Sequence, residues 1–296
     1  MIKAFKYLII IGTVLFIQGF VFKPLMISSD AMSSCLEKGD YIILNKWQTN
    51  FAENSNLEVR NQVLAFHYPL DKGGIEKKAV YVKRCVGLPG DSLLLQEGLT
   101  NDFNGALKFD YVLDDEANLI DEATLEKLHI EVRAKIMRHH WLLSLSEKDV
   151  EKIKEIAPRL NPEIILQNKD EYDESIFPSD MLHKWNRDFF GPLYIPKAQD
   201  KIHLNRSNIS HYSKIIQEYE GHTLELHNGT IRIDGEIATT YTFQQNYYFF
   251  MGDNRHQSID SRYWGLVPQD HLIASCSRIL FNIEKPLSKG FFKPIK

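Results

Sequence analysis

The chain has 296 residues, of which 44% are hydrophobic and 25% are charged, and its formal net charge is -4. This composition is ordinary for a globular protein with a hydrophobic core, and the length allows one large domain or two smaller ones. The slightly acidic balance argues against a broad nucleic-acid-binding surface. The 3 cysteines have no spacing typical of a metal site, so we expect neither a disulfide framework nor a bound metal.

The first segment is apolar and has basic flanks. Residues 7–22 carry no charge, Lys3 and Lys6 precede them, and Lys23 follows. The run is slightly shorter than the roughly 20 residues that cross a bilayer, but lysine side chains at its ends can reach the interface. Basic residues before an apolar run favour a cytoplasmic N-terminus. The sequence therefore predicts a single membrane anchor, with the rest of the chain on the outer side.

The next stretch, residues 27–40, is crowded with small and hydroxyl residues. It can be a plain linker after an anchor, or a loop that presents a nucleophile near the membrane surface. Ser29 and Ala31 also fit the small residues that precede a signal-peptide cleavage site, so a cleaved N-terminal signal is the alternative to an anchor. The residues of this region alone leave both alternatives open.

Most later segments have the pattern of β-strands. They are short, rich in β-branched and aromatic residues, and bounded by turn formers. A hairpin is indicated by Asn228-Gly229 between two alternating runs. The last segment is either a strand pair or one long strand. The expected strands are residues 41–45, 63–68, 79–86, 92–95, 193–196, 223–227, 230–234, 247–251 and 272–283.

The middle of the chain has helical features. Residues 122–140 show an imperfect helical spacing of apolar side chains. Ser146 is a suitable N-cap for a helix that ends near Ile156, before a proline. Residues 210–218 also have a helical pattern. We interpret residues 97–185 as an inserted accessory subdomain rather than a second active domain.

The candidate catalytic group is a lysine in an apolar strand. No histidine lies in a context typical of a Ser-His-Asp hydrolase, and the known alternative is a Ser-Lys pair. Its lysine must be neutral to act as a base, so it must be desolvated. Lys83 lies among the apolar residues 79–82 and meets this requirement. A solvated lysine on an edge strand is the ordinary alternative.

Three segments together resemble the type I signal peptidases, membrane-bound endopeptidases that use a Ser-Lys pair. Residues 29–40 contain SDAM followed by GD, residues 81–91 are YVKRCVGLPGD, and residues 248–268 are YFFMGDNRHQSIDSRYWGLVP. The second and third segments are long, and the three occur in the order typical of the family. Residues 190–196 are similar to the form found in Bacteroidetes members. The resemblance favours the anchor over the cleaved signal.

The resemblance implies a role for several side chains. Lys83 would be the general base, Ser258 would orient its amine, and Ser29 would donate a hydrogen bond in the oxyanion hole. Ala31 occupies the position of the nucleophile. The implied supporting residues are Tyr81, which packs beside the site, the pair Asp260 and Arg262, and Gly252 and Asn254 in the turn of the third segment.

The resemblance also implies a mainly β fold, with a catalytic β domain, a second small β domain, a helical insertion and one N-terminal transmembrane helix. Signal peptides of exported preproteins, membrane lipid and the protein export machinery are the implied partners, and no cofactor is implied. The catalytic domain would lie on the periplasmic side of a bacterial inner membrane. The expected arrangement is a cytoplasmic segment at 1–6, an anchor at 7–22, catalytic β domain at 23–96, accessory domain at 97–245 and catalytic β domain at 246–296.

The sequence departs from the family at the nucleophile, because Ala31 has no hydroxyl. Ser34-Cys35 also replaces the Pro-Thr usual in the family. Three explanations stay open. The chain can be a Ser-to-Ala variant of an active enzyme, a natural pseudoenzyme that binds signal peptides or an envelope protein without cutting, or an enzyme in which Ser29 or Ser33 attacks instead. A disulfide between Cys35 and Cys85 is also left open.

Overall fold

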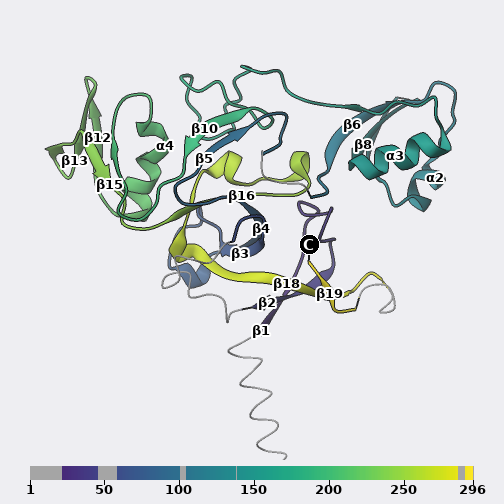
Figure 1. Ribbon diagram of the computed structural model, residues 1–296, viewed down its shortest axis with the longest axis horizontal. Coiled ribbons are helices and arrows are strands. Elements are labelled where there is room, and N and C mark those ends of the chain that lie inside the picture. The colour runs from purple at the N-terminus through teal and green to yellow at the C-terminus, as the bar shows by residue number, and fades with distance from the viewer. Residues whose placement is uncertain (1–21, 46–58, 101–104, 138, 286–290, 296) are drawn as a thin grey trace, which may run out of the picture.

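The computed structural model describes residues 22–45, 59–100, 105–137, 139–285 and 291–295, and strands dominate it (Figure 1). The largest unit is an antiparallel, curled sheet in the order β1-β2-β18-β3-β4-β16-β17, with β19 also paired to β18. Its strands are β1 (Phe22–Met26), β2 (Asp40–Asn45), β3 (Val63–His67), β4 (Val80–Gly87), β16 (Tyr247–Met251), β17 (Val267–Pro268), β18 (Leu272–Asn282) and β19 (Lys293–Pro294).

The central strand β3 is buried on both faces of this sheet. Val63 and Ala65 pack into one cluster with Ile42 and Leu44 of β2. Its alternate residues, among them Phe66, pack into a second cluster on the other face. Because successive side chains of a strand point to opposite faces, a strand covered on both sides needs a continuous apolar run.

One edge of β4 is only partly paired. Strand β3 pairs with residues 80–84 of β4, whereas β16 pairs on the other edge only with residues 84–87. Among the described residues, no strand pairs with the other edge of residues 80–83. The outer edge of β1 is also without a described strand partner. Free strand edges expose backbone groups that can pair with another extended chain.

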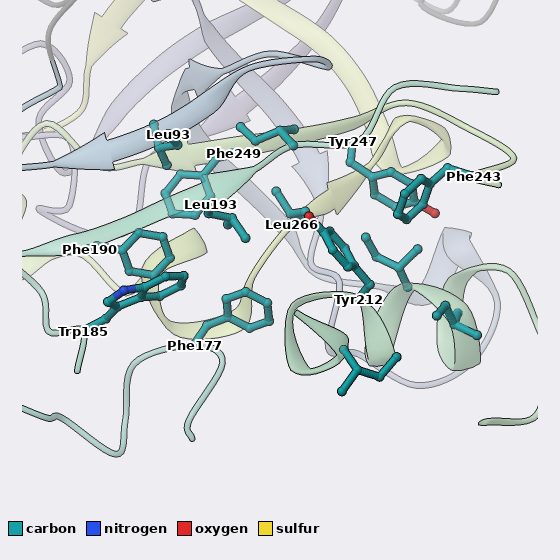
Figure 2. Packing of buried hydrophobic residues seen from close by; sticks show 14 of the residues in the cluster. Leu93, Phe177, Trp185, Phe190, Leu193, Tyr212, Phe243, Tyr247, Phe249 and Leu266 are labelled. Carbon is teal, nitrogen blue, oxygen red and sulfur yellow. The ribbon is translucent and has the colours of Figure 1, made fainter. Parts of the chain in front are cut away.

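A second region contains small sheets around a large aromatic core (Figure 2). Side chains of β16, such as Tyr247 and Phe249, belong to this core, so it is continuous with the main sheet. Asn228 and Gly229 both have positive φ, as a tight hairpin turn requires. The elements are β5 (Ser92–Leu95), β10 (Phe190–Tyr194), β11 (Lys201–His203), α4 (Ile209–Lys214), the π-helical turn η3 (Ile215–Tyr219), β12 (Leu224–His227), β13 (Thr230–Ile233), β14 (Glu236–Ile237) and β15 (Thr240–Thr242).

The insertion forms a separate four-stranded sheet with its own core, seen on the right of Figure 1. The strand order is β7-β8-β6-β9, and two helices cover one face. Leu113, Leu125, Leu143 and Ile153 are fully buried between them. The elements are β6 (Phe109–Asp114), α2 (Glu122–Lys127), β7 (Glu131–Met137), β8 (His140–Leu145), α3 (Glu147–Ile156) and β9 (Glu163–Ile164).

Most predicted elements are confirmed, and the final segment is one long strand, β18. The helix from Ser146 is also confirmed, with a capping box between Ser146 and Asp149. The prediction for residues 122–140 is wrong beyond Lys127. There the chain turns at His129, which has a positive φ of 57°, and continues as β7 and β8. Cross-strand pairing overrides a weak helical pattern at this position, so the insertion is mixed rather than helical.

The predicted membrane anchor falls on residues that the structure does not describe. The apolar run at residues 7–22 lies outside the described residues, apart from Phe22 at the start of β1. Within the described part of the chain, no helix is long and apolar enough to span a membrane. Residues 22–26 themselves form strand β1, which the sequence did not suggest.

Candidate active site

Lys83 lies on β4, at the last position of the free edge. The residue is only 4% exposed, and its Nζ donates a hydrogen bond to Ser258 Oγ over 2.9 Å. Burial lowers the pKa of the amine from its usual 10.5 to about 8, although the carboxylates of Asp260 and Asp253 act in the opposite direction. With this pKa about a tenth of the amine is neutral at pH 7, far more than for an ordinary lysine, and a general base must be neutral.

The segment that carries Ser258 is held by a buried ion pair. Arg262 donates from Nε and Nη2 to the two carboxylate oxygens of Asp260, over 2.9 and 2.8 Å. Its Nη2 also donates to the carbonyl of Arg255 over 2.5 Å. Asp260 Oδ2 in turn accepts from the backbone N–H of Gly252 over 3.0 Å. The pair therefore joins both ends of the loop around Ser258.

A second buried ion pair lies at the start of the same loop. Arg84 donates through Nε and Nη2 to both oxygens of Asp253, over 2.7 and 2.5 Å. Burial raises the pKa of the neighbouring Cys35 thiol, and the Asp253 carboxylate raises it further. Cys35, Cys85 and Cys276 are free thiols, so no disulfide joins the first two segments.

The loop that contains Ala31 is attached to this segment through Asn254. The Asn254 N–H donates to the carbonyl of Ala31 over 3.1 Å. Its side-chain Nδ2 donates to the carbonyl of Asp30 and to Ser33 Oγ, over 3.2 and 3.0 Å. Asn254 therefore fixes the backbone on both sides of position 31.

Gly252 has no room for a side chain. A Cβ at this position would lie 2.3 Å from Ser258 Oγ and 2.5 Å from the carbonyl oxygen of Ala31. Only glycine allows strand β16 to end this close to both residues.

A cleft of about 440 Å³ opens between the end of β1 and the free edge of β4. Ser29, Ala31, Tyr81 and Lys83 all line it. Ser258 is buried and is not among the lining residues, and it meets the site through its hydrogen bond with Lys83. The remaining lining residues are Leu25, Met26, Ile27, Ser28, Met32, Ala79, Val80, Val82, Gln257 and Ile259.

Tyr81 belongs to an aromatic cluster beside the cleft. Its ring stacks on Tyr68 with 4.5 Å between centroids, and it meets Trp264 edge-on at 5.5 Å. The contact with Trp264 links the free edge of β4 to the short helix α5 (Ser261–Trp264). Tyr81 therefore lines the cleft with a ring that is held on two sides.

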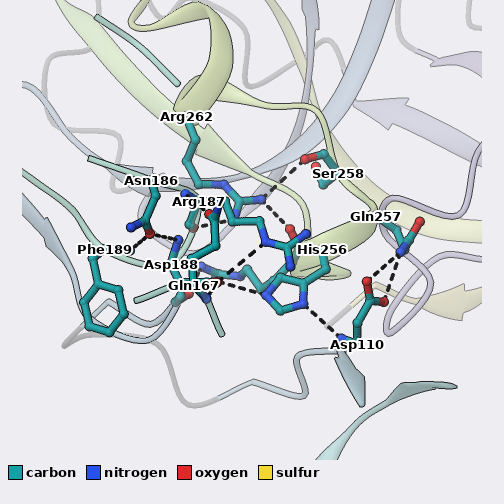
Figure 3. A network of polar contacts seen from close by, with 12 residues as sticks. Asp110, Gln167, Asn186, Arg187, Asp188, Phe189, His256, Gln257, Ser258 and Arg262 are labelled. Atoms are coloured by element: carbon teal, nitrogen blue, oxygen red, sulfur yellow. Dashed lines mark hydrogen bonds and ion pairs between the residues drawn. The ribbon is translucent and has the colours of Figure 1, made fainter. Parts of the chain in front are cut away.

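The sequence did not indicate two of the polar contacts at this site. Gln257 lines the cleft and bonds to Asp110 of the insertion, and His256 bonds to Asp188 (Figure 3). The partners lie 147 and 68 residues away in the chain, so no local pattern could indicate them. Among the described residues, no group of three or more His, Cys, Asp or Glu side chains could hold a metal ion.

Comparison with known proteins identifies similar sequences. The family model described as signal peptidase, peptidase S26, matches residues 1–123 and 195–281. Signal peptidase I of Buchnera aphidicola subsp. Schizaphis graminum is 24% identical over 280 residues, covering 92% of this chain and 72% of that protein. Signal peptidase I of Pseudomonas aeruginosa is 33% identical over 129 residues, covering 39% of this chain and 42% of that protein. The stretch that the family model leaves unmatched includes β7, β8 and α3 of the insertion.

Proposed function

The chain belongs to the signal peptidase family, peptidase S26, and from this premise we propose that its cleft binds the signal peptides of exported preproteins. Its similarity to signal peptidase I proteins supports signal-peptide removal as the reaction for which the site is built. One observation carries the proposal. The buried residue Lys83 lines a cleft beside a free strand edge.

The peptide would bind in an extended form. Residues 80–83 have a free edge, and an extended peptide can pair with it through backbone hydrogen bonds. The lining side chains beside this edge are small or apolar, among them Ala79, Val80 and Ile27. They suit the small side chains that precede a signal-peptide cleavage site.

A serine at position 31 would complete a Ser-Lys pair. Neutral Lys83 has a lone pair to accept the serine proton, while one of its N–H groups donates to Ser258 Oγ. The serine oxygen then attacks the peptide carbonyl, and a hydroxyl such as that of Ser29 donates to the oxyanion. Protonated Lys83 gives its proton to the leaving amine. Water, activated by the neutral lysine, then releases the new carboxyl end of the signal peptide and regenerates the serine.

Ala31 removes the first step of this sequence, because a methyl group cannot be acylated. We therefore propose that the chain binds signal peptides and does not cut them. Ser33 is a poor substitute nucleophile, since its hydroxyl accepts from Asn254 and it does not line the cleft. Ser29 does line the cleft and is the substitute to test.

The decisive experiment compares this chain with Ala31→Ser in detergent, using a preprotein as substrate. We expect the serine variant to cut after a small-x-small site, and the chain with Ala31 to bind the same signal peptide without cutting. Ser33→Ala in the serine background is a matched control and should still cut. If neither form binds the peptide, the proposal is wrong. If the chain cuts with Ala31 in place, Ser29→Ala identifies whether the neighbouring hydroxyl attacks.

The proposed location is the outer side of a bacterial plasma membrane. Members of this family are membrane-associated, and residues 7–22 are apolar enough to serve as an anchor. Met26 is 44% exposed at the end of β1 and lines the cleft, where it can contact lipid. Protease added outside spheroplasts should degrade the chain beyond residue 23. Full protection would contradict this orientation.

A further inference from the structure

The inserted subdomain is bonded to the segment that forms the site. The backbone N–H of Lys108 donates to the carbonyl of Asp253 over 2.9 Å, and the N–H of Arg255 donates to the carbonyl of Lys108 over 2.8 Å. Ser144 Oγ on β8 donates to Asn254 Oδ1 over 3.2 Å. The insertion is therefore not an independent appendage, because its first strand is joined to the loop beside the cleft.

The most specific of these contacts joins Asp110 to Gln257. Gln257 Nε2 donates to both carboxylate oxygens of Asp110, over 3.0 and 3.2 Å (Figure 3). Asp110 is only 8% exposed. A carboxylate has only acceptor sites, so the amide must turn its NH2 group toward Asp110. The Gln257 oxygen consequently faces away from the insertion.

This oxygen is an acceptor at the edge of the cleft. Gln257 lines the cleft together with Lys83 and Ala31. No described residue donates a hydrogen bond to Gln257 Oε1. A peptide that pairs with β4 through one of its edges still has N–H groups on its other edge. Each of these N–H groups needs an acceptor when water is excluded.

We infer that Gln257 Oε1 accepts a hydrogen bond from one backbone N–H of the bound peptide, and that Asp110 of the insertion is the positioning residue that holds the amide in this orientation. The inference rests on the proposed function, since it names a contact of the peptide in the same cleft. It gives the insertion a role in substrate recognition: β6 supplies the group that orients a wall of the cleft.

The test uses the full chain in detergent and a set of synthetic signal peptides. Each peptide carries an N-methyl group on one backbone nitrogen, and its Kd is compared with that of the unmethylated peptide. At one position, N-methylation should weaken binding to the native chain by roughly threefold to tenfold, the size expected for one net hydrogen bond. In Gln257→Ala, methylation at the same position should no longer cause this loss. Comparing the loss in the two proteins cancels the steric effect of the methyl group.

Asp110→Asn tests the positioning role. An asparagine can donate as well as accept, so the Gln257 amide can turn over. We expect a smaller loss of affinity for the unmethylated peptide, about twofold to fivefold, and a reduced penalty at the same methylated position. Asp114→Asn on the same strand is the matched control, because Asp114 is exposed and pairs only with His140 at 3.6 Å among the described residues. Thermal melting checks that each variant is folded.

The outcomes separate this inference from the function on which it rests. If the native chain binds the peptide but Gln257→Ala leaves every N-methyl penalty unchanged, the inference is wrong and peptide binding stands. If Asp110→Asn behaves as Asp114→Asn does, the positioning role is wrong. If no peptide binds the native chain, both the proposed function and the inference are overturned.

Discussion

The segment of residues 252–262 has two sides, and their polar groups are paired to different degrees. On the inner side, Asp253 and Asp260 each form a two-point ion pair with an arginine, and all four residues are buried. On the side of the cleft, the amine of Lys83 meets only the neutral hydroxyl of Ser258 among the described residues.

This difference indicates that the inner side of the segment stabilises the loop, and that the side facing the cleft carries the chemistry. Paired charges in a buried site are satisfied and hold the loop in one conformation. A buried amine without an adjacent counter-ion is costly, and such perturbed groups are typical of functional sites. The same loop therefore combines a stable inner side with an outer side that gives up stability for reactivity. Changes on each side should have different effects.

The largest expected effect is on catalysis. In the Ala31→Ser background, Lys83→Met should lower cleavage by roughly 10^4-fold to 10^6-fold, because it removes the base proposed to take the serine proton. Cleavage by the serine variant should rise with pH through about 8, since only the neutral amine accepts a proton. Initial rates between pH 6 and 9.5 measure both. Lys77→Met, an exposed lysine, is the control and should cut normally. A flat pH profile would contradict the assignment of Lys83.

The next largest effect is on the inner side. Asp253→Ala should lower the free energy of unfolding by about 3–5 kcal/mol, because it removes the buried carboxylate that pairs with the Arg84 guanidinium at two points. Urea denaturation measures the loss. The double variant Arg84→Met with Asp253→Leu should recover most of it, since it removes both charges. A loss below about 1 kcal/mol in the single variant would show that the pair does not support the loop.

A stability change of opposite sign is expected at Lys83 itself. Its pKa is lowered from 10.5 to about 8, so between these pH values the unfolded chain is protonated and the folded chain is not. Stability of the native chain should therefore rise with pH across this window, by up to roughly 3 kcal/mol. Lys83→Met removes the cost and should be more stable than the native chain at pH 7.

The difference between Lys83→Met and the native chain should shrink as the pH approaches 10.5. Lys77→Met is again the control, and its difference from the native chain should not depend on pH. If Lys83→Met were less stable than the native chain at pH 7, burial of the amine would not be destabilising, and this prediction would be wrong.

The elements that sequence patterns could predict are those with local signals. Strands β3, β4 and β16 are apolar runs bounded by turn formers, and the Asn228-Gly229 turn selects its own hairpin. The apolar strand around Lys83 left a solvated lysine as the ordinary alternative, and the resemblance to the family favoured the buried position that the structure shows. These features depend on residues close together in the chain.

The features that could not be predicted depend on distant partners. Strand β1 is stabilised by pairing with β2, whereas its own sequence, with Lys23 and Pro24 after the apolar run, has no strand pattern. Strand β7 has a helical spacing of side chains, but β8 pairs with it. The contact between Gln257 and Asp110 joins residues 147 positions apart. In each case the deciding interaction is between segments whose proximity only the fold creates.

The smallest expected effect is on the stability of the insertion, and it tests whether that stability matters for the contact between the insertion and the segment of residues 252–262. Ser146→Ala removes the capping box of α3 and should cost about 1 kcal/mol of stability. Hydrogen exchange should rise in α3 and in β8, whose side chains pack under it, while the Kd for a signal peptide should stay unchanged. A higher Kd would mean that the insertion acts on the cleft through its overall stability, rather than through the single contact between Asp110 and Gln257.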